Sequence, residues 1–126
     1  MIVHLDTSFL IRALSSGSAE DRRLRLWLRD GAVLAVSAIC WAEFLCGPVG
    51  EEALDLATRL LGQPLPFEAA DAAMAAHLFN LAGRRRGSLT DCMLAATAVA
   101  AGARLATSDA ADFRRFEPAG LAIVTA

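Results

Sequence analysis

The chain has 126 residues and a formal net charge of −2, which is the size of one domain with its own core. Apolar residues make up 56% of it, which excludes a disordered chain and indicates extensive buried or interface surface. The slightly acidic balance excludes binding to nucleic acid through net charge alone.

The first half of the chain predicts strands that alternate with capped helices. Ile2–Leu5 and Val33–Val36 are short apolar runs with β-branched residues, which is typical of buried strands. Serine or threonine residues are placed to cap the first three expected helices, and Gly47-Pro48 ends the third. The helices expected here are Thr7 or Ser8 to about Leu14, Ser18 to about Asp30, Ser37–Cys46 and Glu51–Leu61.

The second half predicts two more helices and two more strands. A short connecting segment at Leu65–Phe67 is a candidate fifth strand, and a long helix is expected over Glu68–Arg85. Thr90 or Asp91 caps a helix to Ala101 that is apolar nearly all round, so we expect it to be central. The last strands are expected at Arg104–Thr107 and Leu121–Val124.

Strands alternating with helices predict an α/β fold over residues 1–126 as a single domain. We expect a central, mostly parallel sheet of four to five strands with helices on both faces. In such sheets the site lies beyond the carboxyl ends of the strands. Asp6 and Asp109 follow the first and the penultimate strand, and Glu43 and Asp91 lie on helices that would flank that crevice.

These four acidic residues are the candidate catalytic residues. Asp6, Glu43, Asp91 and Asp109 all stand among apolar or small residues, where a carboxylate is costly to bury unless it is paired, hydrogen-bonded or bound to a cation. Oxygen ligands of this kind hold Mg²⁺ or Mn²⁺ against phosphates. The pattern therefore predicts a metal-dependent phosphodiesterase that acts on nucleic acid.

Cysteines and hydropathy bear on where the protein works. Three cysteines without a CxxC spacing predict reduced thiols rather than disulfides or a zinc site. No charge-free apolar run approaches the roughly 18 residues of a membrane span. Asp6 interrupts the first apolar stretch, so we expect no signal peptide and a cytoplasmic location.

Four short motifs, in order, resemble those of PIN-domain ribonucleases, and specifically of VapC-like toxins from bacterial toxin–antitoxin pairs. The resemblance covers essentially the whole chain. Cys92 and Met93 depart from it, since smaller or aliphatic residues are more usual there. The motifs are Asp6-Thr7-Ser8, Trp41-Ala42-Glu43, Leu89–Ala98 with Asp91 near its start, and Thr107–Phe113 with Asp109 and Asp112.

The resemblance implies a PIN-like fold and endoribonuclease activity that depends on Mg²⁺ or Mn²⁺. It places the metal on Asp6, Asp91 and Asp109, with Glu43 as the fourth catalytic residue. It also implies an RNA substrate, a homodimer and inhibition by a cognate VapB-like antitoxin. An activated water would be the nucleophile.

Other residues have both a functional and a structural interpretation. Each of the four acidic residues, taken alone, also fits a helix cap, a turn or a half-exposed helix position. Arg84-Arg85-Arg86 would track an RNA backbone or simply end a helix. Thr7, Ser8 and Thr107 would orient the carboxylates or serve as ordinary cap and turn residues. Asp112 would support or join the site as a ligand, or cap a helix.

Two rival functions remain open at this stage. A non-catalytic RNA-binding PIN domain would be expected to lack some of the four acidic residues, and all are present. An α/β phosphotransfer domain that uses Asp6 is the other rival. A phosphatase of that kind would carry a second Asp where Ser8 stands, and a receiver domain would carry a late Lys, which this chain lacks.

The sequence also predicts docking surfaces. Leu24, Trp27 and Leu28 repeat at helical spacing and are candidates for a groove that accepts an antitoxin segment. The helices around Glu51–Leu61 and Met74–Leu81 are candidates for a homodimer face.

Overall fold

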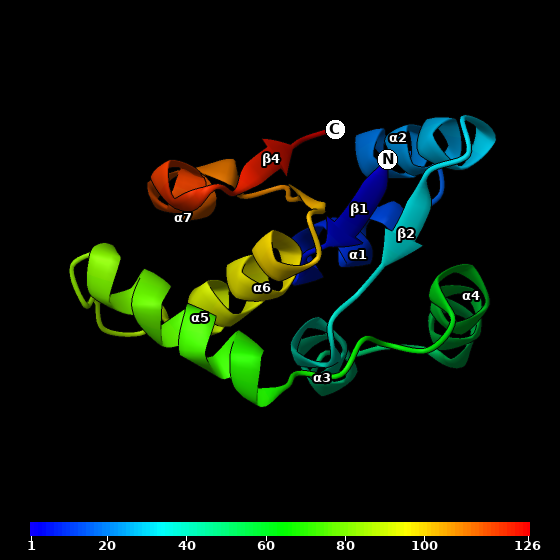
Figure 1. The fold of residues 1–126 in the computed structure, drawn as a ribbon. Helices are drawn as coiled ribbons and strands as arrows, with labels where there is room; N and C mark the ends of the chain where they lie inside the picture. The colour runs from blue at the N-terminus through cyan, green and yellow to red at the C-terminus, as the bar shows by residue number, and fades with distance from the viewer.

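A computed structural model describes all residues from Met1 to Ala126. Four short strands form one sheet, and helices pack on both of its sides (Figure 1). The chain order is β1 (Ile2–Leu5), α1 (Thr7–Ala13), α2 (Ala19–Arg29), β2 (Val33–Ala35), α3 (Ala38–Cys46), α4 (Glu51–Leu61), α5 (Ala69–Leu81), α6 (Leu89–Ala100), β3 (Arg104–Ala106), α7 (Ala110–Phe113), the 3-10 helix η1 (Arg114–Ala119) and β4 (Ala122–Val124).

The sheet is parallel throughout, with the order β2-β1-β3-β4. The chain leaves β1 toward β2 on one side and later returns to β3 on the other. The topological switch point therefore lies between β1 and β3, where a crevice opens at the carboxyl ends of the strands. Leu5 of β1 pairs with Ala106 of β3, so Asp6 and Thr107, which follow them, emerge side by side.

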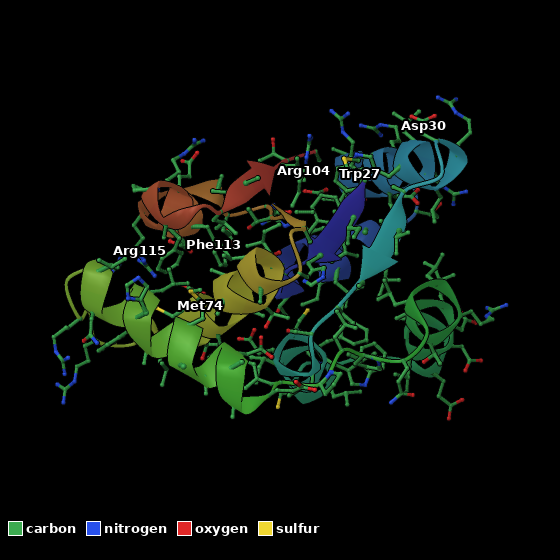
Figure 2. The ribbon with its side chains drawn as sticks, in the orientation of Figure 1. Trp27, Asp30, Met74, Arg104, Phe113 and Arg115 are labelled. Carbon is green, nitrogen blue, oxygen red and sulfur yellow. The ribbon has the colours of Figure 1, made fainter.

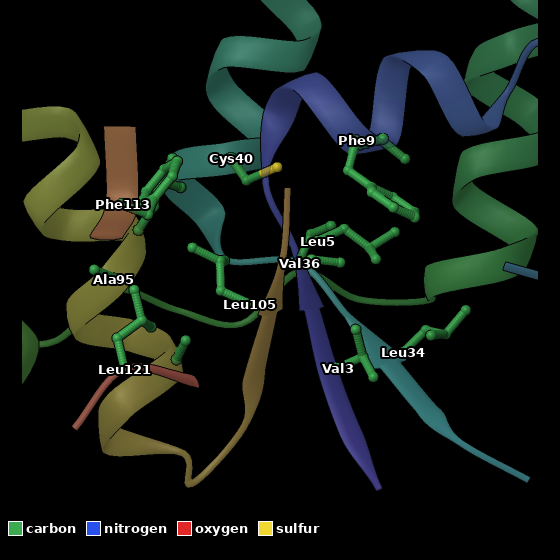
Figure 3. Packing of buried hydrophobic residues seen from close by; sticks show 14 of the residues in the cluster. Val3, Leu5, Phe9, Leu34, Val36, Cys40, Ala95, Leu105, Phe113 and Leu121 are labelled. Carbon is green, nitrogen blue, oxygen red and sulfur yellow. The ribbon is translucent and has the colours of Figure 1, made fainter. Parts of the chain in front are cut away.

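The core lies on both faces of the sheet. Val3 pairs with Leu34 and His4 with Leu105, so alternation places Val3 and Leu105 on opposite faces. Figure 3 shows Leu105 gathered with Ala95 of α6, and Phe9 of α1 on the other side of the strands. Helices on both faces and a parallel sheet are confirmed, and α6 is as central as its sequence predicts, with six buried residues.

Two predictions about the middle of the chain are wrong. Leu65 makes only an isolated bridge to Ser37, so Leu65–Phe67 is not a strand and the sheet has four strands. The long helix ends at Leu81 instead of Arg85. Gly83 and Arg84 both have positive φ (83° and 56°), a left-handed backbone that no α-helix continues through. The arginines therefore lie on the α5–α6 loop.

The start of α6 and the segment after β3 also differ from prediction. Ser88 is the N-cap residue of α6, in place of Thr90 or Asp91. Asp91 is consequently a residue of the first helical turn. Beyond Asp109 the chain forms α7 and η1, two short helices that the sequence pattern does not predict.

The predicted antitoxin groove on α2 is not there. Leu24 and Trp27 are 4% and 7% exposed, and the Trp27 ring stacks on Phe9 with the centroids 5.5 Å apart. Both side chains belong to the core, and only Leu28 is exposed.

Two further predictions can be compared with the structure. All three cysteines are free thiols, of which Cys46 alone is exposed. No helix has the length and apolar character needed to cross a membrane.

Candidate active site

Five carboxylates line one cavity of about 310 Å³ at the carboxyl ends of β1 and β3. They come from four segments: the end of β1, helix α3, the first turn of α6, and the turn into α7. The structure thus brings together all four predicted catalytic residues, together with Asp112. The five carboxylates are Asp6, Glu43, Asp91, Asp109 and Asp112.

Asp6 is the most deeply placed of these groups, with only 3% of its surface exposed. It caps α1, and its Oδ1 accepts hydrogen bonds from the Phe9 amide (2.8 Å) and the Ser8 hydroxyl (2.9 Å). Its Oδ2 accepts from the Thr107 hydroxyl at 2.5 Å. Burial raises the pKa of Asp6; these hydrogen bonds oppose the rise and the nearby Asp109 adds to it. The capping and functional interpretations of Asp6 are therefore compatible.

Thr107 connects the two strand ends. It is fully buried, and while its hydroxyl donates to Asp6 it accepts the amide of Asp109 at 2.9 Å. One side chain thereby fixes the carboxylate after β1 and the backbone that carries the carboxylate after β3. These contacts are the kind that a residue orienting the carboxylates would make, and the supporting role of Thr107 stays a prediction.

Ser8 begins a second chain of contacts away from the cavity. Its oxygen accepts the Ser108 amide at 3.2 Å, and the Ser108 hydroxyl donates to Glu20 at 2.9 Å. Glu20 is itself 3.9 Å from a guanidinium nitrogen of Arg12. The sequence analysis missed Ser108 and Glu20, because nothing in their local pattern distinguishes them from ordinary turn and helix residues.

Glu43 is held by Thr7. The Thr7 hydroxyl donates to Glu43 Oε1 at 2.6 Å and lies 3.8 Å from Cys40 Sγ. Cys40 is fully buried, and burial raises the pKa of its thiol to about 12. The thiol therefore stays protonated and does not compete with oxygen ligands for a cation.

Asp91 faces an arginine that the sequence analysis missed. Nη2 of Arg115 lies 3.4 Å from Asp91 Oδ2, and the guanidinium also lies over the Phe116 ring, 4.7 Å from its centroid. Burial raises the pKa of Asp91, Arg115 lowers it, and Asp112, Glu43 and Asp6 raise it further. The only visible signal for Arg115 is its place three residues after Asp112, which does not identify it from sequence.

The arginines of the α5–α6 loop divide between two places. Arg85 and Arg86 line a second, neighbouring cavity that includes Asp91 and Asp112. Arg84 instead donates to Asn80 and lies over the Phe79 ring, so it lines neither cavity.

The donor set suits a hard divalent cation, since every titratable group lining the larger cavity is a carboxylate. No group of three or more His, Cys, Asp or Glu side chains is arranged to hold a metal ion by protein ligands alone. Mg²⁺ commonly binds through one or two carboxylates and fills its remaining positions with water and substrate phosphate, so a site for it does not need three direct protein ligands.

Fold and cavity together define an α/β protein with a carboxylate site at the switch point of a parallel sheet. The sequence matches the family model of the PIN domain over residues 3–117. The chain therefore belongs to the PIN domain family, as its motifs predict. A comparison with curated proteins finds no match.

Solved structures with the same fold include toxin–antitoxin proteins. VapBC2 from Rickettsia felis, bound to a promoter DNA fragment, is 22% identical with a TM-score of 0.77, covering 100% of this chain and 99% of that one. FitAcB from Neisseria gonorrhoeae is 27% identical with a TM-score of 0.69, covering 98% and 96%. VapC20 from Mycobacterium tuberculosis, a sarcin–ricin loop cleaving toxin, is 22% identical with a TM-score of 0.62, covering 94% and 95%.

Proposed function

We propose that this chain is an endoribonuclease toxin that hydrolyses RNA with the help of a divalent cation, Mg²⁺ or Mn²⁺. The observation that carries the proposal is the convergence of five carboxylates on one cavity at the switch point of a PIN fold. A non-catalytic RNA-binding domain has no need to collect acidic groups where an RNA phosphate must approach, because they repel it.

The reaction is the attack of water on phosphorus. A bond forms between the water oxygen and phosphorus, one ester P–O bond breaks, and the leaving oxygen takes a proton. A bound divalent cation would supply positive charge to the phosphate and lower the pKa of water. Asp6, Asp91 and Asp109 are the residues that we assign to hold it, directly or through a bound water, with Glu43 as the fourth catalytic group.

The chain's own contribution is to hold these carboxylates before substrate arrives. Three hydrogen bonds fix both oxygens of Asp6, and one fixes Glu43. Such preorganisation removes the cost of orienting the groups during the reaction. We therefore assign to Thr7, Ser8 and Thr107 the role of positioning the carboxylates.

We also propose an antitoxin as partner, by analogy with the antitoxin complexes among the solved structures. An apolar cavity of about 300 Å³ lies between α1 and the α3–α4 segment, lined by residues that include Leu14, Phe44 and Val49. Ile11 lines both this cavity and the carboxylate cavity. A VapB-like segment seated there would reach the acidic site with a Lys or Arg, and this surface replaces the buried α2 residues as the candidate groove.

A homodimer remains part of the proposal. Leu56 on α4 and Leu81 at the end of α5 are 38% and 64% exposed, so apolar side chains of both candidate helices are available for a contact between two copies. Light scattering of the purified chain measures its oligomeric state directly. A monomeric chain would refute the proposed homodimer and leave the nuclease assignment unaffected.

The decisive experiment compares RNA cleavage by the wild type, Asp6→Asn and Asp55→Asn in Mg²⁺ or Mn²⁺. Asp55 is exposed on α4, outside both polar cavities. The Asp55→Asn substitution therefore makes the same change of charge and shape away from the site. We expect Asp6→Asn to lose most of the activity and Asp55→Asn to keep it. Equal cleavage by both variants would identify a contaminating nuclease or a different site.

A second control separates the enzyme from a binder. If the folded wild type binds RNA but cleaves none in either metal, the rival RNA-binding interpretation is correct. Co-expression with the product of a small reading frame immediately upstream tests the antitoxin, which should co-purify with the chain and suppress its activity.

A further inference from the structure

Beside the carboxylate cavity lies a smaller cavity of opposite character. Its volume is about 180 Å³, no hydrophobic residue lines it, and three of its seven lining residues are arginines. Asp91 and Asp112 line both cavities, so the two are adjacent. The larger cavity has five carboxylates and no basic residue, whereas the smaller one has three guanidinium groups and two carboxylates.

Arg115 has hydrogen-bonding capacity that the protein does not use. A guanidinium carries five N–H donors. The one polar contact of Arg115 is the 3.4 Å approach to Asp91, and its buried Nε has no partner. Buried donors are normally satisfied, so an unpaired one requires an explanation. The Phe116 ring lies beneath the guanidinium of Arg115, and only 18% of the Arg115 side chain is exposed. Both features restrict the position of the guanidinium.

The start of α6 adds further unpaired donors to this region. Ser88 offers no side-chain cap, because its hydroxyl donates to the Arg85 carbonyl. The first α6 amide with a backbone acceptor is that of Cys92, which leaves those of the preceding three residues unpaired. Amides at a helix start favour an anion. Figure 2 shows Arg115 at the same end of the molecule as the loop that leads into α6.

We propose that this smaller cavity binds a backbone phosphate of the RNA next to the scissile phosphate, with Arg115, Arg85 and Arg86 as its ligands. The inference rests on the proposed function, since it needs a substrate whose scissile phosphate occupies the carboxylate cavity. Successive phosphates of one strand then meet the carboxylate cavity, through its cation, and the guanidinium groups in turn. Asp91, between the two, holds Arg115 in place until phosphate arrives.

This arrangement explains how an acidic chain attracts an anionic substrate. The net charge is −2 and the catalytic cavity is acidic, so steering must come from a local basic site. Arg85 and Arg86 are exposed on the loop and able to reach a strand in solvent, whereas Arg115 is half-buried and fixed. The loop arginines capture the backbone and Arg115 sets its register.

The test measures RNA affinity apart from cleavage. Fluorescence anisotropy of a labelled, short single-stranded RNA is followed in EDTA over a range of salt concentrations. The proteins are the wild type, Arg115→Gln, Arg86→Gln and the matched control Arg114→Gln. Arg114 is the sequence neighbour of Arg115 but is exposed and pairs only with Glu117, outside both cavities. Circular dichroism checks that each variant is folded.

We expect Arg115→Gln to weaken RNA binding by roughly tenfold, the scale of one charge-assisted hydrogen bond. The slope of log K against log salt should fall by about 0.7, as for one lost phosphate contact on a single strand. Arg86→Gln should lower both the RNA affinity and the salt slope, and Arg114→Gln should match the wild type in both. If Arg115→Gln does not fold, the affinity and salt slope of Arg86→Gln alone decide whether the smaller cavity binds phosphate.

Two outcomes overturn the inference. One is that Arg115→Gln and Arg86→Gln both bind RNA with the affinity and salt slope of the wild type. The other is that Arg115→Gln changes only Mn²⁺ affinity, measured separately by calorimetry, which would make Arg115 a support for Asp91 alone. Failure of the proposed function has a different signature: the wild type binds RNA in the arginine cavity but cleaves none when Mg²⁺ is added.

Discussion

Replacing Thr107 by valine should separate the hydroxyl's role from its packing. Valine has nearly the same shape, so the fully buried site stays filled while the O–H group is lost. Two contacts disappear: the 2.5 Å hydrogen bond to Asp6 Oδ2 and the 2.9 Å hydrogen bond from the Asp109 amide. The other two donors to Asp6 both reach Oδ1, so Oδ2 is left without a partner.

The size of the effect follows from these contacts. A hydrogen bond to a charged group contributes about 1.5–3 kcal/mol, and loss of a partner leaves the buried acceptor desolvated. The Asp109 amide lies nearer the surface, where water replaces the hydroxyl at small cost. We therefore expect Thr107→Val to lower the free energy of unfolding by about 2–3 kcal/mol near neutral pH. It should also raise the pKa of Asp6 further, since the Thr107 hydrogen bond lowers that pKa.

Urea unfolding of Thr107→Val and Thr97→Val measures the difference. Thr97 is also buried, but its hydroxyl donates to the Met93 carbonyl one turn earlier in α6 and holds no carboxylate. Its loss should cost less than about 1 kcal/mol. Thr107→Ser, which keeps the hydroxyl, should recover most of the cleavage activity that valine removes. If Thr107→Val is no less stable than Thr97→Val, the hydrogen bond does not position Asp6 and the reasoning fails.

Three further outcomes are expected. Because burial raises the pKa of Asp6 and Asp91, the stability present when they are protonated is lost as pH rises through their raised pKa values. Mg²⁺ should therefore raise the free energy of unfolding near neutral pH by about 2.7 kcal/mol at a hundredfold excess over Kd, seen as a higher Tm, and Asp6→Asn should show a smaller rise. Burial lowers the pKa of His4, whose Nδ1 has no partner. The contribution of neutral His4 to stability should therefore be full above about pH 6.5 and fall below it. His4→Leu should flatten this pH dependence of the free energy of unfolding, measured in urea. Ellman's reagent should label only Cys46 in the folded protein, because Cys40 and Cys92 are buried, and all three thiols in urea. Rapid labelling of Cys40 in the folded protein would show that the interior opens readily.

The sequence predicts the convergence of Asp6 and Asp109 well, and the sheet explains why. Short apolar runs separated by helices favour a parallel sheet with right-handed crossovers. Any residue that directly follows β1 must then meet those that follow β3, since Leu5 pairs with Ala106. The sequence therefore places both residues at one edge of the sheet, and the structure adds that β1 and β3 are neighbours.

Arg115 and Glu20 escape sequence analysis for the opposite reason. Arg115 meets Asp91 across 24 positions, and Ser108 meets Glu20 across 88. Neither contact is set by strand pairing or by helical periodicity. They depend on how η1 and α2 pack against the site, which is a matter of tertiary geometry.

The docking prediction for α2 fails through a related ambiguity. A repeat such as Leu24, Trp27 and Leu28 shows that one helix face is apolar, but it does not say what covers that face. Here Phe9 of α1 stacks on Trp27, and Leu24 and Trp27 belong to the buried core. The prediction for the end of α5 is wrong because of backbone conformation. Arg84 adopts a positive φ, which is uncommon for a residue with a side chain and cannot be predicted from its type.

The charges of the site are distributed in a way that stability alone does not explain. Asp6 is almost fully buried, yet its three hydrogen-bond partners are two hydroxyls and an amide, and no basic residue lines its cavity. Asp91 has one guanidinium, at 3.4 Å. A chain selected for stability only would neutralise or pair such carboxylates, because an uncompensated buried charge costs several kcal/mol. Hydroxyl and amide donors instead fix the direction of Asp6 and leave its charge uncompensated, as the proposed binding of a divalent cation requires. If the proposed cation site is correct, the cost of this uncompensated charge is a physical consequence of keeping the site ready to bind.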